Sequence, residues 1–157
     1  ELLILKGAQG IALLQPEKLL QSLQDGYRPP KVSTVMRLKL PRASLEALKK
    51  LVEAPPASAR WILSGESSAQ RYAVTTPAEV FTVYATGLGP LAQYEDERFY
   101  NVIVKEAADS FPYFDARTDA GLPWSSPVQC CLELSLLDKR ERALAGEVAK
   151  SILAKLK

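Results

Sequence analysis

The chain has 157 residues, of which 47% are hydrophobic and 24% are charged, and its formal net charge is +2 at pH 7. This length supports one domain with a hydrophobic core. The complete absence of histidine excludes Ser-His-Asp and Cys-His nucleophile systems, as well as zinc sites built on imidazole. The net charge is too small to indicate nucleic-acid binding by itself.

The sequence shows no sign of a membrane or secreted protein. No apolar run is long enough to cross a bilayer, and we find no pattern of a secretory signal. Cys130 and Cys131 are adjacent, and neighbours on a helix point about 100° apart, so they are poor candidates for a shared bond or metal. Two unpaired cysteines favour a reducing compartment, and we expect the cytoplasm. Because the sequence begins at Glu1, we expect it to be a piece of a longer protein.

The first third alternates short apolar segments with helices. A strand, a second short apolar run, a helix, a longer strand and another helix are predicted at residues 1–6, 11–14, 16–26, 31–40 and 45–52. The longer strand alternates cleanly, and its outer face carries three basic residues: Lys31, Arg37 and Lys39. We interpret this face mainly as a solvated edge, with phosphate contact as the alternative.

The central stretch is the most organised part of the sequence. An apolar lead-in at residues 61–63 reaches Ser64, which is a good N-cap for a short helix that starts at Gly65. We expect Pro77 to end that helix. A strand rich in β-branched and aromatic residues follows at residues 80–85.

The acidic residues that a nucleotide-processing enzyme needs are missing from this stretch. A nucleotidyltransferase holds Mg²⁺ with two carboxylates at positions i and i+2 of a strand, but the strand carries Thr82 and Tyr84. The acidic pair at that spacing, Glu95 and Glu97, falls in a polar loop. No Asp-x-Lys or Glu-x-Lys occurs, which excludes a restriction-type nuclease.

The last third is predicted to contain strands at residues 100–105 and 111–116, a turn at residues 119–121 and two helices. Asp115 and Arg117 are interpreted as a tether, with a catalytic role of residues 115–119 as the alternative. Trp124 is interpreted as a core residue, with an exposed anchor for a partner as the alternative. Ser126 caps the helix that opens at Pro127, and Asp138 caps the final helix. The whole pattern predicts an α/β (α+β) fold, with helices packed on a mixed sheet of about four to five strands.

Residues 121–134 and 138–143 resemble the end of the AbiEi-like antitoxin family of type IV toxin–antitoxin systems. The most specific block is Ser126-Pro127-Val128-Gln129. Residues 63–69 and 80–84 are similar to the middle of that family, and residues 15–20 are similar to its start. The resemblance covers nearly the whole chain.

The resemblance implies an antitoxin and transcriptional regulator that neutralises a nucleotidyltransferase toxin and represses its own operon. In that family an N-terminal winged helix binds the operator, so we expect residues 1–157 to be the single antitoxin-like domain that follows it. This domain is expected to have no enzymatic activity and no cofactor, and to reach DNA through the parent protein. Our hypothesis for the fold is a degenerate nucleotidyltransferase-like domain, with Ser64, Gly65, Pro127 and Gln129 as its defining residues.

Two other functions stay open at this point. One is a divergent nucleotidyltransferase or nucleic-acid-processing enzyme. The other is a basic nucleic-acid-binding module. That module would use basic residues of the longer strand and the last helix: Lys31, Arg37, Lys39, Lys139, Arg140 and Arg142.

Overall fold

The structure is a computed structural model that describes residues 4–8, 10–41, 45–53, 60–88 and 91–156. In this part of the chain the main sheet has six strands. In spatial order they are β3 (Val32–Leu38), β6 (Val102–Ala107), β5 (Phe81–Ala85), β4 (Trp61–Leu63), β8 (Leu122–Trp124) and β7 (Arg117–Asp119). The pairs β5–β6 and β4–β8 are parallel, and the other neighbouring pairs are antiparallel. The predicted mixed α/β (α+β) class is therefore confirmed, with six strands in place of four to five.

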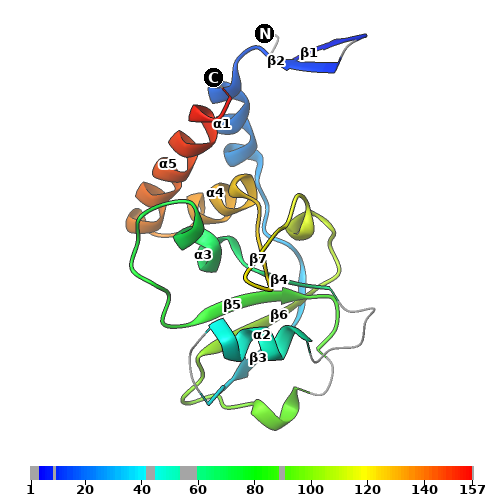
Figure 1. Ribbon diagram of the computed structural model, residues 1–157, viewed down its shortest axis with the longest axis vertical. Coiled ribbons are helices and arrows are strands. Elements are labelled where there is room, and N and C mark those ends of the chain that lie inside the picture. The colour runs from blue at the N-terminus through cyan, green and yellow to red at the C-terminus, as the bar shows by residue number, and fades with distance from the viewer. Residues whose placement is uncertain (1–3, 9, 42–44, 54–59, 89–90, 157) are drawn as a thin grey trace.

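A separate hairpin of β1 (Ile4–Gly7) and β2 (Gly10–Leu13) projects from the helical end of the molecule (Figure 1). It agrees with the two apolar segments predicted at the start of the chain. Every residue of both strands is exposed, including Leu5 at 53% and Ile11 at 65%. The hairpin thus presents apolar side chains to solvent instead of adding them to the core.

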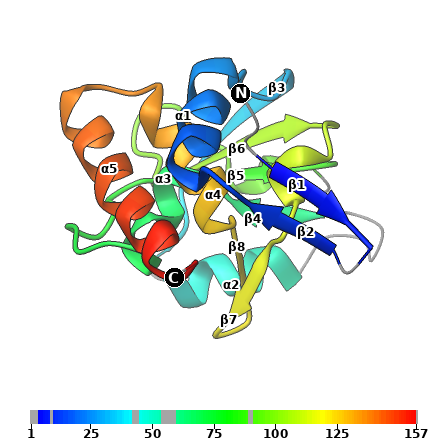
Figure 2. The same cartoon turned by 90° about the horizontal axis from the view of Figure 1, so that it is seen from above.

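The helices lie on both sides of the sheet (Figures 1 and 2). One side holds α1 (Pro16–Gly26), α4 (Pro127–Ser135) and α5 (Lys139–Ala154), and the opposite side holds α2 (Leu45–Glu53). Leu48 of α2 packs into a core with Leu63, Val83 and Trp124 of the sheet. A second core joins the other three helices through small and apolar side chains: Leu20, Cys130, Cys131, Leu134, Ala145 and Val148.

The connection between β4 and β5 is short and tightly bonded. The Ser64 side chain caps α3 (Gly65–Ser68) by accepting the N–H of Ser67 at 3.3 Å. Ser67 Oγ in turn accepts the backbone N–H of Thr82 at 2.8 Å, and the Ser64 N–H donates to the Thr82 carbonyl at 2.9 Å. The predicted N-cap is confirmed, and these bonds fasten the turn to the first residues of β5.

Several sequence predictions need correction. Residues 111–116 do not form a strand, because Phe111–Tyr113 is a 3₁₀ turn and Asp115 has a φ of 49°. Pro112 has no N–H to offer a strand partner. The helical segment after Ser64 ends with a 3₁₀ turn at Ala69–Arg71, well before Pro77. The strands β4, β7 and β8 were not predicted.

Other predictions are confirmed. Cys130 and Cys131 are free and buried, and Trp124 is 2% exposed in the core. Ser126 Oγ caps α4 by accepting the N–H of Gln129 at 3.1 Å. The expected break at Pro55 and Pro56 lies outside the described residues. Among the helices that are described, none combines the length and the apolar character that a membrane crossing requires.

Candidate functional site

A pocket of about 170 Å³ lies where β5, β6, α3 and the last turn of α4 meet. Its polar lining comes from elements that are far apart in the sequence: Tyr27, Ser64, Glu66, Thr82, Tyr84, Lys105 and Glu133. Its apolar lining consists of Pro29, Leu136 and Leu137. The pocket therefore combines hydroxyl groups, two carboxylates and one ammonium group in a small volume.

Glu133 holds the Gly65 turn against α4. One carboxylate oxygen accepts the backbone N–H of Gly65 at 2.8 Å, and the other accepts Nε2 of Gln129 at 2.8 Å. Burial raises the pKa of Glu133 to about 7, although both hydrogen bonds and the nearby Lys105 act in the opposite direction. A carboxyl group that titrates near neutral pH inside a pocket is a mark of a functional site.

Gly65 lies where α3 passes close to α4. A Cβ atom added at Gly65 would stand 2.9 Å from Cα of Cys130 and 2.9 Å from Cβ of Glu133. Cys130 Sγ also lies 3.1 Å from the Gly65 carbonyl oxygen. This approach leaves no room for a side chain, which gives a packing reason for the glycine that the sequence analysis singled out.

Gln129 connects α1 with the pocket. Its side chain is 5% exposed, and Nε2 donates to the Tyr27 hydroxyl at 2.9 Å as well as to Glu133. Tyr27 is the residue that follows α1. Gln129 therefore fixes the end of α1, the carboxylate of Glu133 and, through it, the Gly65 turn.

The strand face that lacks the acidic pair points into this pocket. Thr82 and Tyr84 both line it, and Tyr84 pairs with Lys105 across the parallel β5–β6 register. Tyr84 is 5% exposed, and burial raises its pKa. Among the described residues, no hydrogen bond reaches the Tyr84 hydroxyl group. No cluster of three or more His, Cys, Asp or Glu side chains suited to a metal occurs in the described part of the chain.

A larger groove of about 630 Å³ runs between residues 74–79 and the first half of α5. Four glutamates line it, Glu66, Glu79, Glu141 and Glu147, with Arg140 as the basic member of the lining. Val74 is fully exposed at its border. The groove therefore has an excess of negative charge.

The predicted basic contact residues are distributed over separate elements. Lys31 and Lys39 flank β3, Arg37 lies within it, and Lys139, Arg140 and Arg142 are exposed on the first turns of α5. Arg37 forms an ion pair with Glu97 at 3.0 Å and lies over the Tyr100 ring at 5.5 Å. Its charge is therefore already partly neutralised within the chain.

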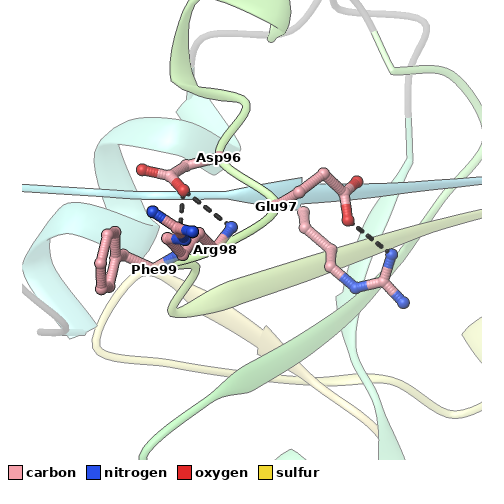
Figure 3. A network of polar contacts seen from close by, with 5 residues as sticks. Asp96, Glu97, Arg98 and Phe99 are labelled. Atoms are coloured by element: carbon pink, nitrogen blue, oxygen red, sulfur yellow. Dashed lines mark hydrogen bonds and ion pairs between the residues drawn. The ribbon is translucent and has the colours of Figure 1, made fainter.

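The loop that supplies Glu97 is organised by Asp96. The Asp96 carboxylate accepts the backbone N–H groups of Arg98 and Phe99, each at 2.9 Å (Figure 3). These bonds hold the pKa of Asp96 below its ordinary value. The polar-loop interpretation of Glu95 and Glu97 agrees with this geometry. The Asp115–Arg117 tether also forms, at 2.7 Å.

Glu133, Lys105 and Tyr27 were not among the sequence-predicted site residues. The one available signal was an acidic residue within the apolar run Cys130-Cys131-Leu132-Glu133-Leu134.

No family model, curated protein or solved structure matches this chain.

Proposed function

We propose that this chain is a non-enzymatic antitoxin and transcriptional-regulator domain of a type IV toxin–antitoxin system, acting in the cytoplasm. It counteracts a nucleotidyltransferase-type toxin and supports repression of its operon, with operator DNA bound through the parent protein. The observation that carries the proposal is the strand–turn–helix–strand unit around Gly65, in which Thr82 and Tyr84, two positions apart on β5, face the pocket in place of carboxylates.

The geometry of this unit supports a degenerate nucleotidyltransferase-like domain. β4 and β5 are antiparallel neighbours, and the capped helix between them is bonded to Thr82 through Ser67. A transferase would direct two carboxylates from this strand face toward Mg²⁺, which prefers carboxylate oxygens. Hydroxyl groups at both positions are weak ligands, so the unit has the strand and helix arrangement of such a domain without metal-binding side chains.

Two surfaces are available for a protein partner. The groove beside α5 carries four glutamates, and such a surface favours association with a basic segment of a partner. The β1–β2 hairpin exposes Ile4, Leu5 and Ile11, and clustered apolar side chains at a surface mark protein contacts. A toxin bound to the groove would be sensitive to charge reversal there.

The test is co-expression with the adjacent reading frame of the source genome. We expect the neighbour to stop growth and residues 1–157 to restore it. Glu141→Lys combined with Glu147→Lys should weaken the rescue, whereas Glu17→Lys, an exposed residue of α1, should leave it intact.

Two outcomes would count against the proposal. A harmless neighbour would remove the toxin–antitoxin basis altogether. Rescue only by the longer parent protein would show that this domain does not carry the neutralising activity. For the charge-reversal variants, comparing the thermal unfolding of each with that of the wild type separates a lost contact from misfolding.

A further inference from the structure

The Tyr84 hydroxyl has no hydrogen-bond partner among the described residues, and its oxygen is accessible from the pocket. The side chain is 5% exposed, and it lines the pocket beside Glu133. Other buried hydroxyls in this region are bonded: Ser125 Oγ donates to the Leu63 carbonyl at 2.6 Å, and Ser68 Oγ accepts the Ser125 N–H at 3.1 Å. The Tyr84 hydroxyl is therefore free to accept a hydrogen bond from a molecule that enters the pocket.

The charges of the pocket define the ligand. Glu66 and Glu133 supply two carboxylates, and Lys105 is the cation of the lining. Within the described residues, no lysine or arginine nitrogen makes an ion pair with Glu133 within 4 Å. A buried carboxylate is stabilised when a cation pairs with it and donates hydrogen bonds. A ligand that donates to a carboxylate and a tyrosine oxygen meets these requirements.

We propose that this pocket binds an organic cation, an alkylammonium or guanidinium group, that donates hydrogen bonds to Glu133 and Tyr84. The alkyl stem of the ligand would lie against the apolar border formed by Pro29, Leu136 and Leu137. The aliphatic stems of lysine and arginine commonly pack on apolar surface in this way. The volume of about 170 Å³ suits one such group. The cation is either a free small amine or a basic side chain of a partner protein, and the site does not depend on the antitoxin proposal.

The pH dependence of cation binding follows from the charged and titratable groups that face Glu133. These groups are Tyr27 after α1, Glu66 on α3, Tyr84 on β5, Lys105 on β6 and Cys130 on α4 itself. Burial raises the pKa of Tyr27, Tyr84 and Cys130, so these three stay neutral. Since Glu133 titrates at about 7, its ionised fraction rises about tenfold between pH 6 and pH 8, and cation affinity rises with it.

The test uses the full chain and NMR titrations with three cations: methylguanidinium, n-butylammonium and the blocked peptide acetyl-Gly-Arg-Gly-amide. The reporters are the Gly65 backbone amide and the Gln129 side-chain amide, because both donate to Glu133. We expect saturable shifts and tighter binding at pH 8 than at pH 6. If the peptide binds much more tightly than the two small cations, the natural ligand is a basic side chain of a partner protein. If all three bind with equal affinity, the natural ligand is a free amine.

Three variants make the proposal falsifiable. Glu133→Gln and Tyr84→Phe should each weaken cation binding, by about tenfold for loss of a charged hydrogen bond, whereas Lys105→Met should strengthen it by removing a competing cation. Glu17→Gln and Tyr94→Phe, at exposed positions, should change nothing. Binding of inorganic phosphate that Lys105→Met abolishes would overturn the proposal. Absence of saturable shifts with all three cations at pH 8 would overturn it too.

Discussion

Replacing Gly65 with alanine tests the close approach of α3 and α4. The added Cβ would stand 2.9 Å from the Cα of Cys130 and from the Cβ of Glu133, whereas carbon atoms in contact normally lie about 3.5–4.0 Å apart. Cys130 contributes a backbone atom inside α4, so relief requires the two helices to separate by roughly half an ångström or more. Overpacking of this kind costs about 1–3 kcal/mol, which lowers the melting temperature by roughly 2–4 °C per kcal/mol in a chain of this size.

Gly146→Ala is the matched control for this substitution. Gly146 is exposed within α5, and nothing lies within 4 Å of the Cβ that alanine would add. Alanine is a better helix former than glycine by about 0.8–1.0 kcal/mol, so this variant should be more stable than the wild type. Urea unfolding monitored by circular dichroism measures both changes. A Gly65→Ala protein as stable as the wild type, beside a stabilised Gly146→Ala protein, would refute the packing argument.

Three further outcomes follow from the same part of the fold. Glu133 has a folded pKa of about 7, above its ordinary value, so ionisation opposes folding; the free energy of unfolding should fall by about 2.5 kcal/mol between pH 5 and pH 8, and urea titrations of Glu133→Gln should lack this component. Burial raises the pKa of Cys131 to about 11 and that of Cys130 further, so neither thiol should react with an aromatic disulfide reagent before the chain unfolds, and rapid native-state modification would contradict this. Ser126→Ala should lower stability by about 1 kcal/mol through loss of the α4 cap, more than Asp138→Ala, whose side chain makes no cap hydrogen bond; equal losses in denaturation would argue against the cap.

Local chemistry explains which elements the sequence predicts well. Ser64 and Ser126 identify two helix starts, and Pro16 and Gly26 bound α1, because caps and backbone restrictions act within a few residues. The three-residue strands β4, β7 and β8 carry no such signal. The single parallel register pair between β4 and β8, Leu63 with Trp124, joins segments 61 residues apart, and no local pattern reports that pairing.

Residues 111–116 show the opposite failure. Three aromatic side chains suggest a strand by propensity, but Pro112 cannot donate to a sheet and Asp115 adopts a positive φ. The candidate pocket was only partly predictable for a related reason. Gly65 was identified from its turn and helix start and Gln129 from the resemblance, yet the residue that joins them, Glu133, is 68 positions from Gly65 and looks like an ordinary polar position on a helix.

Glu133 has two tasks. Its bonds to Gly65 and Gln129 need two acceptor oxygens, which a carboxylate has and an amide lacks. The negative charge strengthens both bonds, since both lower the pKa of the carboxyl group, but burial outweighs them and ionisation costs stability as the pH rises through 5 to 7. A cation beside the carboxylate would offset that cost. Lys105 is near enough to influence the carboxyl group but makes no ion pair with it within 4 Å. The two oxygens of Glu133 thus hold the Gly65 turn, and its negative charge favours a cation in the pocket.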